Sequence, residues 1–382
     1  MSKAKPKLAI VMAGGGSRAA YQVGVLKAIG KCLKKGAPSP FSIICGTSAG
    51  AINAAGLAAR ADHYNAAVRQ LNLVWSNFTS DKVFRTDVAG ITKTGAHWLM
   101  AMLLGGLGKH GPMYLLDRKP LRKLLERYLD NDVYQAGIEV GVLDALSVSA
   151  SGYSSHQSVA FFHGRDGLKN WKRAQRIGVA SNITIDHLMA SSAIPFLFAP
   201  QKINREYFGD GSMRQTAPIS PALHLGAERI LVIGNRMQKV PEPQRVTNPD
   251  FPTLGEIAGH ALDSIFLDSL DADIERLQRI NRTVGLIDEN EREKQGITLR
   301  QVDVQVIYPS QNLGALAQQH AHELPWTLRI LMRSLGAYSK NNSSLLSYLL
   351  FEQGYCRALI DLGYKDTLDK REEIEQLLVG VI

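Results

Sequence analysis

Two apolar runs near the N-terminus are each followed by a glycine-containing turn and then by a segment with helical periodicity. Residues 8–13, LAIVMA, lead into GGGSR and then into a stretch whose apolar residues recur every three to four positions. Residues 41–45, FSIIC, lead into GTSAG and then into the alanine-rich AINAAGLAAR. Apolar strands that alternate with helices are typical of a mainly parallel sheet covered on both faces. The pattern therefore predicts an α/β fold.

Later parts of the chain carry the same kinds of pattern. A long amphipathic helix is predicted over 254–284, and another helix within 343–364, where Ser343 or Ser344 would cap its start and Gly363 its end. Further strands are predicted in residues 144–151, 159–164, 228–236 and 302–308.

The distribution of these elements suggests a division of the chain. Strands and helices alternate through residues 1–240, which we expect to form the main domain. Residues 241–382 are expected to form a mostly helical C-terminal extension with one strand at 302–308. We expect this extension to pack on the main domain and to cover part of its sheet.

The glycine-rich turn at 14–19 has two chemical interpretations. Backbone N–H groups at a helix N-terminus can bind the pyrophosphate of a dinucleotide, or they can stabilise a transient oxyanion. A dinucleotide site also needs an acidic residue about twenty positions further on. Residues 31–45 contain no Asp or Glu, which argues against a nicotinamide or flavin cofactor.

The pentapeptide GTSAG has the residues that a nucleophile elbow requires. Such an elbow is a strained turn between a strand and a helix, and small residues on either side of the nucleophile allow the backbone segments to pass closely. The apolar strand before the pentapeptide and the alanine-rich helix after it provide this context. The pattern therefore predicts that Ser48 is a nucleophile, although a small residue in an ordinary tight turn would give the same five letters.

Two kinds of general base follow Ser48 in the sequence. His163, His224 and His260 lie in plausible loops, but their neighbours do not indicate a positioned base. Asp210 lies between two glycines after a short apolar strand, and the preceding LMASSAIPFLFAP predicts that this turn is set into the core. A lone Asp-Gly is usually only a turn, so the residues alone leave the choice of base open.

Three motifs, GGGSR, GTSAG and DGS, occur in this order and together resemble those of the patatin-like phospholipases, which are bacterial-type acyl hydrolases. The segment ASSAIPFLFAP resembles the one that precedes the aspartate in that family. The similarity covers about residues 8–221. Ala19 and Ser212 stand where many relatives have glycine, and both are small enough to preserve the backbone path.

The resemblance implies a three-layer α/β/α catalytic domain over 1–240 and a serine lipid acyl hydrolase of the phospholipase A or lysophospholipase type. It implies a Ser–Asp dyad that acts through an acyl-enzyme intermediate, without a cofactor or a metal. An aspartate with an ordinary pKa of about 3.9 is a weak base for a hydroxyl, so we expect burial to raise its pKa. The implied roles are nucleophile for Ser48, general base for Asp210, oxyanion loop for Gly14, Gly15, Gly16 and Arg18, elbow for Gly46, Thr47, Ala49 and Gly50, and neighbours of the acid for Gly211 and Ser212.

Alternative functions remain open at this point. The same dyad would serve an acyltransferase or a thioesterase, and the glycine-rich turn would also suit a non-catalytic protein that binds a nucleotide or a lipid. Arg18 has three interpretations: it could orient the loop, meet a lipid phosphate, or pair with an acid at the surface.

Composition and charge limit the classes of function and the cellular location that the sequence allows. Hydrophobic residues make up 45% of the chain and charged residues 21%, as in ordinary globular proteins. The formal net charge is +9, but the basic residues are scattered and do not interleave with aromatic residues, which argues against nucleic-acid binding. The three cysteines, without a Cys-x-x-Cys pair, indicate neither a disulfide framework nor a zinc site. A cytoplasmic location is expected.

Membrane contact is the last expectation. The apolar part of the N-terminus is too short for a signal peptide, and no segment reaches the ~18 apolar residues of a membrane span. Residues 98–108, followed by Lys109, Arg118 and Lys119, suit a lid or an element that contacts an anionic membrane surface, where a phospholipid or other lipid ester would be met. A buried helix within the fold is the alternative for this segment.

Overall fold

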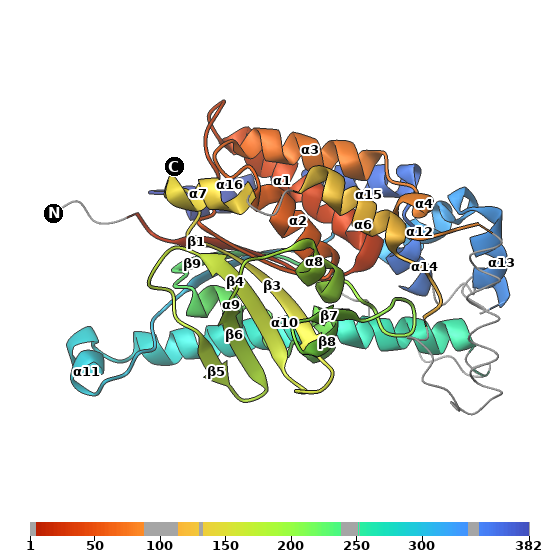
Figure 1. The fold of residues 1–382 in the computed structure, drawn as a ribbon. Coiled ribbons are helices and arrows are strands. Elements are labelled where there is room, and N and C mark those ends of the chain that lie inside the picture. Colours follow the sequence, from red (N-terminus) through yellow and green to blue (C-terminus); the bar gives the residue numbers. More distant parts are fainter. Residues whose placement is uncertain are drawn as a thin grey trace.

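The fold is that of a computed structural model, which describes residues 5–87, 114–129, 133–237, 251, 253–334 and 344–381. Within these residues, ten strands form one mixed sheet at the centre of the molecule (Figure 1). Their order is β10-β9-β1-β2-β3-β4-β6-β5, and β8 pairs with both β3 and β7. The strands are β1 (Leu8–Met12), β2 (Ile43–Thr47), β3 (Ala145–Gly152), β4 (Ser158–Gly164), β5 (Trp171–Arg173), β6 (Arg176–Ala180), β7 (Gln201–Ile203), β8 (Glu206–Asp210), β9 (Arg229–Ile233) and β10 (Asp303–Ile307).

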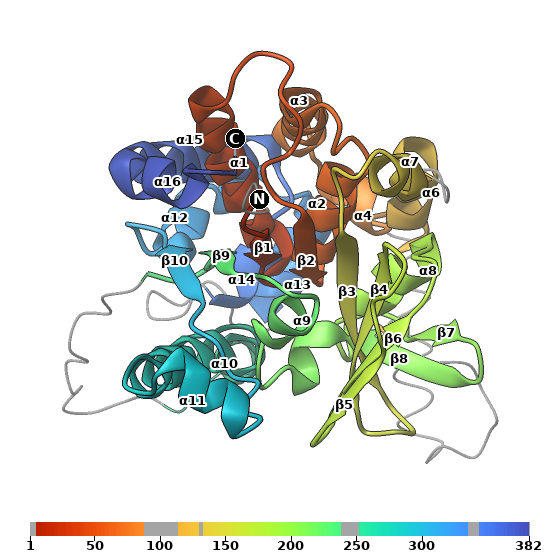
Figure 2. The same cartoon turned by 90° about the vertical axis from the view of Figure 1, so that its left-hand side faces the viewer.

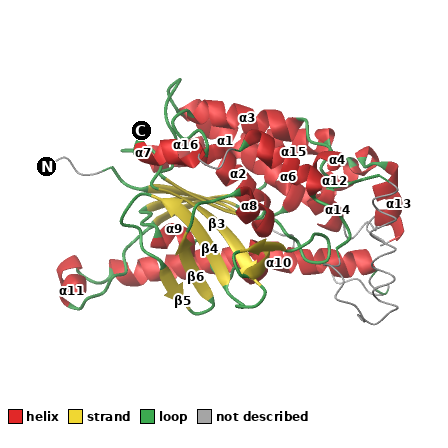
Figure 3. Cartoon of the chain, in the orientation of Figure 1, coloured by secondary structure: helices red, strands yellow, loops and turns green. Residues whose placement is uncertain are grey.

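Helices cover both faces of this sheet (Figures 2 and 3). Helices α1, α2, α3 and α15 lie over one face, and α9, α10 and α11 lie over the other. The helices are α1 (Ala20–Cys32), α2 (Ala49–Ala58), α3 (Tyr64–Ser76), α4 (Ser80–Val83), α6 (Lys119–Tyr128), α7 (Val133–Glu139), α8 (Ile185–Ser191), α9 (Ser220–His224), α10 (Leu254–Gly285), α11 (Glu289–Lys294), α12 (Leu313–Gln319), α13 (Trp326–Ser334), α14 (Ser344–Leu349), α15 (Gln353–Leu368) and α16 (Arg371–Leu378). Short 3-10 helices η1 (Gly16–Ala19), η2 (Gly211–Arg214) and η3 (Ala321–Glu323) complete the set.

The two hydrophobic cores follow from the alternation of side chains along the strands. Leu8, Ile10 and Met12 belong to the core under α1, α2 and α15, whereas Ala9 and Val11 belong to the core under α9 and α10. Successive side chains of a strand point to opposite faces, so an apolar run such as LAIVM is buried on both sides. Strand β1 pairs in parallel with both β2 and β9, at the centre of this arrangement. The predicted α/β fold, with a mainly parallel sheet between helices, is confirmed.

The C-terminal third contributes to the same sheet. Strand β10 pairs in parallel with β9 and forms the edge of the sheet, close to the predicted span of 302–308. Helix α15 packs closely on α1: a side chain at Gly363 would collide with the backbone of Tyr21, and one at Gly24 with the backbone of Ile360. These glycines allow the two helix backbones to approach each other, which larger residues would prevent.

The prediction of one helix that Gly363 ends was wrong. The chain forms two helices, α14 and α15, and Gly363 lies inside α15. Glu352 has an extended backbone between them, and its Oε1 accepts hydrogen bonds from the N–H and the Oγ of Ser80, at 3.2 and 2.7 Å. This long-range contact fixes a bend that the helical periodicity of the segment does not reveal.

Membrane-related expectations can be compared with only part of the chain. No helix in the described ranges combines the length and the apolar character needed to cross a bilayer. The predicted lid or membrane-contact segment at 98–108 and Lys109 lie outside the described residues.

Candidate active site

Ser48 occupies a strained turn between β2 and α2. Its backbone has φ 55° and ψ −129°, a conformation that residues with a side chain rarely adopt. A side chain at Gly50 would lie 2.6 Å from the carbonyl oxygen of Ala13, and one at Gly46 would lie 2.6 Å from the Cα of Ala51. The glycines therefore allow the turn and α2 to pack directly on the sheet, as a nucleophile elbow requires.

A network of buried side chains holds this turn in place. The N–H of Ser48 donates to Ser191 Oγ at 2.9 Å, and Ser191 Oγ donates to the carbonyl oxygen of Ser149 at 2.6 Å. Thr47 Oγ1 donates to Gln215 Oε1 at 2.9 Å, and Gln215 Nε2 donates to Ser149 Oγ at 3.0 Å. Strained backbone persists where its surroundings determine it from several sides. Sequence reasoning did not single out Ser191 or Gln215, because nothing in the sequence shows that they meet at the turn.

Asp210 lies beside the serine at the end of β8. Ser48 Oγ donates to Asp210 Oδ2 at 2.6 Å, and the N–H of Ser212 donates to Asp210 Oδ1 at 2.9 Å. A side chain at Gly211 would collide with the carbonyl oxygen of Ser149, so a glycine is required after the aspartate. The structure thus brings together the two residues that the motifs suggested, although they are far apart in the sequence.

Burial changes the acidity of this carboxyl group. Asp210 has no exposed surface, and its burial raises its pKa to about 6. The hydrogen bonds from Ser48 and Ser212 and the charge of Arg118 oppose this rise, because each favours the ionised form. The expected burial of Asp210 is therefore complete.

The segment with Arg118 was expected either to contact a membrane surface or to be buried within the fold, and for Arg118 itself the structure shows burial. Its side chain is buried and donates to the carbonyl oxygens of Met189 and Ala199, both at 2.8 Å, and to Ser192 Oγ at 3.1 Å. It also lies 5.0 Å from the centre of the Phe198 ring. Arg118 therefore places a fixed positive charge in the interior near Asp210, while its neighbour in the sequence, Lys119, remains exposed.

None of the candidate histidines contacts this pair. His163 is half-buried, His260 is exposed, and His224 stacks on Trp171 with ring centres 4.9 Å apart. A fourth, His187, is buried at the start of α8, where desolvation lowers its pKa to about 4. Within the described ranges, no histidine forms a hydrogen bond with the serine or the aspartate. No cluster of three or more potential metal ligands occurs in those ranges either.

The glycine-rich turn lies against the serine. A side chain at Gly14 would lie 2.9 Å from Ser48 Cβ and 2.5 Å from Ser212 Oγ. The N–H of Arg18 donates to the carbonyl oxygen of Gly15 at 3.1 Å, whereas the N–H groups of Gly15 and Gly16 have no acceptor among the described residues. Unsatisfied N–H groups next to a nucleophile are what an oxyanion site needs.

The Arg18 side chain points away from this site and into the C-terminal part of the chain. Its Nε donates to Ser347 Oγ at 2.8 Å, its Nη1 to Tyr348 Oη at 3.1 Å, and its Nη2 to Asp263 Oδ1 at 3.5 Å. The guanidinium also lies 4.0 Å above the centre of the Tyr348 ring. Ser17 Oγ donates to the carbonyl oxygen of Ser347 at 2.7 Å. Of the three interpretations of Arg18, this geometry favours the one in which it orients the loop.

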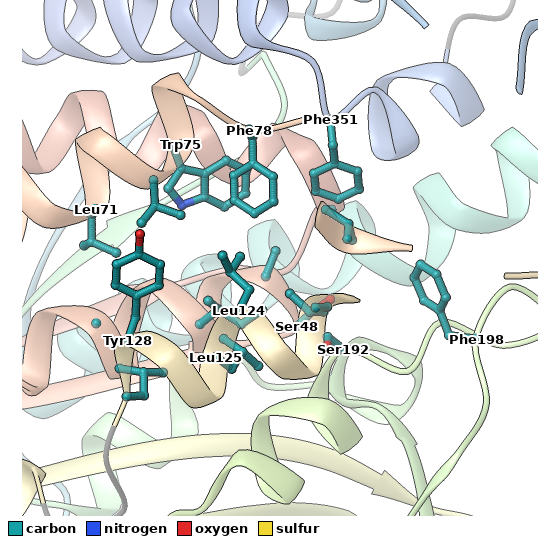
Figure 4. A pocket seen from close by; sticks show the side chains of 18 of the residues that line it. Ser48, Leu71, Trp75, Phe78, Leu124, Leu125, Tyr128, Ser192, Phe198 and Phe351 are labelled. Carbon is teal, nitrogen blue, oxygen red and sulfur yellow. The ribbon is translucent and has the colours of Figure 1, made fainter. Parts of the chain in front are cut away.

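An apolar pocket begins at Ser48 and runs along α2 (Figure 4). Trp75, Phe78 and Phe351 form one side, and side chains of α6, including Leu124 and Tyr128, form the other. The residues that line the pocket are Gly16, Ser48, Ala49, Ile52, Gly56, Ala59, Gln70, Leu71, Val74, Trp75, Phe78, Val83, Leu121, Leu124, Leu125, Tyr128, Leu129, Ser192, Ile194, Phe198, Tyr348, Leu349 and Phe351. Because the lining is almost entirely apolar, the pocket suits a hydrocarbon chain.

A mixed sheet between helices, with a strained serine between a strand and a helix, is the arrangement of an α/β protein that has a nucleophile elbow. Residues 10–223, more than half of the chain, match the family model described as patatin-like phospholipase. The chain belongs to the patatin-like phospholipase family and is a lipid acyl hydrolase. No curated protein matches the chain.

Several solved structures are similar to the chain at low identity. Human GIVD cytosolic phospholipase A2 has 11% identity and a TM-score of 0.46, with 98% of this chain and 60% of that chain covered. VipD from Legionella pneumophila has 11% identity and a TM-score of 0.33, with 94% of this chain and 67% of that chain covered. ExoU of Pseudomonas aeruginosa, in complex with SpcU, has 13% identity and a TM-score of 0.27, with 90% of this chain and 70% of that chain covered. This chain thus spans about 60% of the length of the phospholipase A2, and these similarities assign no role to any residue.

Proposed function

We propose that this chain hydrolyses carboxylic esters of lipids with a dyad of Ser48 and Asp210. The observation that carries the proposal is the 2.6 Å hydrogen bond from Ser48 Oγ to a fully buried Asp210, formed where an apolar pocket begins. The hydrogen bond places a base within reach of the nucleophile's proton, which is the geometric requirement for general base catalysis. The pocket supplies the preference for a lipid substrate.

In the first half of the reaction, Ser48 Oγ attacks the ester carbonyl carbon while Asp210 Oδ2 accepts the hydroxyl proton. The negative charge on the carbonyl oxygen is met by the N–H groups of Gly15 and Gly16. The N–H of Ala49 is also available, because it is the first residue of α2 and has no intrahelical acceptor. One such donor contributes roughly 2.7–4 kcal/mol to stabilisation of the transition state.

The second half of the reaction returns the enzyme to its initial state. The tetrahedral intermediate collapses, the bond to the leaving alcohol breaks, and the proton held by Asp210 passes to the alcohol oxygen. Water then attacks the acyl carbon and gives a proton to Asp210, the bond between Ser48 Oγ and the acyl carbon breaks, and Asp210 returns the proton to Ser48 Oγ as the fatty acid is released. A pKa of about 6 suits both tasks, because the carboxyl group can accept and release a proton near neutral pH.

The acyl chain of the substrate would follow α2 away from the serine. The pocket-lining residues Ala49, Ile52, Gly56 and Ala59 follow one face of α2 and its C-terminal end. From Ser48 to Ala59 the helical rise amounts to about 16 Å. An extended hydrocarbon advances roughly 1.3 Å per carbon, so this length accommodates about twelve carbons.

Both the N-terminal and the C-terminal part of the chain would contribute to the active site. We propose that residues 1–240 form the catalytic domain and carry the dyad and the oxyanion loop, and that 241–382 form an extension packed on it. Tyr348 and Leu349 of α14 line the pocket, and Ser347 accepts hydrogen bonds from the side chains of Ser17 and Arg18, which supports this arrangement. Free Cys32, Cys45 and Cys356 fit a cytoplasmic setting, since thiols remain reduced there.

Labelling with a fluorophosphonate tests the proposal directly. The probe should form a stable adduct on Ser48, located by mass spectrometry of the digested protein. Ser48→Ala should abolish the adduct, and Asp210→Asn should slow its formation by at least a hundredfold, as expected for loss of a general base. If folded wild-type protein remains unlabelled, or if the adduct lies on another serine, the dyad is wrong.

A panel of lipid substrates tests the activity itself. Hydrolysis of diacyl phospholipids, lysophospholipids and acyl thioesters, measured as released fatty acid, separates phospholipase A or lysophospholipase activity from a thioesterase. Adding an alcohol acceptor and measuring its acylation tests for acyl transfer. If protein that the probe labels hydrolyses no ester in the panel, the proposed lipid hydrolase function is contradicted. The dyad of Ser48 and Asp210 would then still stand.

A further inference from the structure

Helix α13 presents an exposed face that combines apolar and basic side chains. Trp326, Arg329, Ile330 and Arg333 are all exposed, and their spacing of three and four residues places them on one face of the helix. Trp326 is 59% exposed and Ile330 60% exposed, which is unusual for such large apolar side chains on a folded protein. The exposed face is therefore not explained by packing within the chain.

The opposite face of α13 anchors the helix. Leu328 and Met332 are buried in the main hydrophobic core, and Thr327 Oγ1 donates to the carbonyl oxygen of Thr86 at 2.9 Å. The anchoring means that the outward face is held in a fixed orientation. Its apolar side chains cannot turn inward without removing Leu328 and Met332 from the core.

The charges on this face have no partners among the residues that the structure describes. No described residue forms a hydrogen bond from its side chain, or an ion pair, with the guanidinium of Arg329 or of Arg333. The same two arginines, with Trp326 and Ile330, border a shallow hollow between α12 and α13. Two free cations around an exposed indole form a surface complementary to anionic headgroups above an apolar layer.

Helix α13 lies near elements that line the apolar pocket. Figure 1 shows α13 at the same end of the molecule as α4 and α14. Val83 of α4 and Tyr348 of α14 line the pocket that begins at Ser48. A membrane bound at α13 would therefore lie at the same end of the molecule as α4 and α14, which contribute residues to the pocket lining.

We propose that the outward face of α13, formed by Trp326, Arg329, Ile330 and Arg333, docks the protein on an anionic phospholipid surface. The indole and the isoleucine enter the headgroup region, and the two guanidinium groups bind lipid phosphates. A second copy of this chain fits the face less well, because a two-fold interface would bring four arginines together. The formal net charge of +9 acts in the same direction, since it attracts the whole molecule to an anionic bilayer. The proposal does not depend on the proposed ester hydrolysis.

Vesicle flotation of the full chain tests this docking surface. The Ser48→Ala background prevents hydrolysis of the vesicles, so that binding is measured separately from activity. The vesicles are phosphatidylcholine, with or without phosphatidylglycerol. Arg329→Gln/Arg333→Gln should weaken binding to the anionic vesicles about thirtyfold, because each basic residue near such a surface contributes about 1 kcal/mol. Added salt should weaken wild-type binding in the same way.

The apolar contribution is tested by a second pair of substitutions. Trp326→Ser/Ile330→Ser should weaken binding to both kinds of vesicle at least tenfold. A matched control is Arg282→Gln/Leu286→Ser, at the C-terminal end of α10, where both side chains are exposed. Figure 1 places that end of α10, next to α11, at the opposite end of the molecule. The control should bind as the parent does, and hydrolysis of a water-soluble short-chain ester, measured with Ser48 intact, should be unchanged in all three variants.

Three results would overturn the proposal. Unchanged flotation of both α13 variants would show that this face is not the docking surface. Equal losses in the control would show that binding depends only on total charge and hydrophobicity. A change from dimer to monomer in the α13 variants, measured by light scattering without lipid, would show that the face binds a second copy of the chain instead.

Discussion

Replacing Asp210 with asparagine should stabilise the folded chain at alkaline pH while abolishing ester hydrolysis. The carboxyl group is fully buried, and burial raises its pKa from 3.8 to about 6. At neutral and alkaline pH the carboxyl of Asp210 is ionised in both states. Its ionisation is less favourable in the folded chain than in the unfolded chain. Asparagine has a similar shape but carries no charge, so it removes this unfavourable ionisation.

The magnitude follows from the linkage between protonation and folding. Below pH 3.8 the carboxyl is protonated in both states, and the raised pKa has no net effect on unfolding. As the pH rises through about 6, the folded state ionises later than the unfolded state, and stability is lost. Above about pH 7 the loss reaches about 3 kcal/mol, which corresponds to the shift from 3.8 to about 6 at 1.36 kcal/mol per pKa unit.

The hydrogen bonds of the site can survive this substitution. The Oδ1 of an asparagine at this position would accept from the N–H of Ser212, as Asp210 Oδ1 does at 2.9 Å. Its amide would donate to Ser48 Oγ, which currently donates to the carboxylate. The second amide hydrogen of the asparagine and the hydroxyl hydrogen of Ser48 would have no acceptor at this buried position, so the gain from removing the charge is partly offset and about 3 kcal/mol is its upper limit.

Thermal unfolding measures this gain. Unfolding entropy of about 2.1 cal/mol/K per residue amounts to about 0.8 kcal/mol/K for 382 residues, so 3 kcal/mol corresponds to about 4 °C. The Asp210→Asn variant should melt up to about 4 °C above wild type at about pH 8 and show no such gain at about pH 4. Ser48→Ala is the control: it removes the nucleophile but keeps the carboxylate, so it should gain nothing at about pH 8. An equal gain at both pH values, or the same gain in Ser48→Ala, would refute the reasoning.

Three further predictions concern the same site. Ester hydrolysis should require ionised Asp210, so its rate should be about half-maximal at pH 6 and about one-tenth of maximal at pH 5; a profile that stays flat down to pH 4.5 would contradict the raised pKa. Ser48→Gly should be more stable than Ser48→Ala by about 1 kcal/mol in urea unfolding, because glycine accepts the φ of 55° without strain; equal stability would show that the turn is not strained. Gly56→Leu should shift chain-length preference towards shorter esters, because residue 56 lies about 12 Å along α2 from the serine. Activity on the shortest ester is the internal control, and an unchanged profile would mean that the acyl chain does not follow α2.

The strands and the elbow were predictable because their signals are local. A run such as LAIVM is apolar at every position because β1 is buried on both faces, and β2 is likewise buried along its whole length, with an apolar start in Ile43, Ile44 and Cys45. The glycines at positions 46 and 50 are needed for close contact of backbone segments within one strand–turn–helix unit. A short stretch of sequence therefore contains every residue that is needed to form the strand, the turn and the start of the helix. Strands β5 to β7 gave no comparable signal, because they are mostly exposed or half-buried and so need no continuous apolar run.

The remainder of the site was not predictable because it depends on contacts between distant residues. Arg118 lies in a basic stretch that suggests a surface, and only the fold shows that backbone carbonyls surround it. Likewise, nothing in the sequence near Arg18 indicates Asp263, which lies 245 residues away and shares the guanidinium with Tyr348. Such a contact depends on how α10 and α14 pack against the glycine-rich turn at residues 14–19.

Two energetically unfavourable features coincide at the proposed dyad. A non-glycine residue with the backbone of Ser48 costs about 1–3 kcal/mol, and the ionised carboxyl of Asp210 adds about 3 kcal/mol above neutral pH. Together they amount to a large fraction of the roughly 5–15 kcal/mol of net stability of a domain, so neither would persist on a mobile loop. Ser191 and Gln215 bind the turn from one side, and α14 fixes the glycine-rich loop from the other. In the proposed mechanism, residues 241–382 would therefore contribute to reactivity through rigidity, because α14 holds the glycine-rich loop beside the strained Ser48 and the buried Asp210.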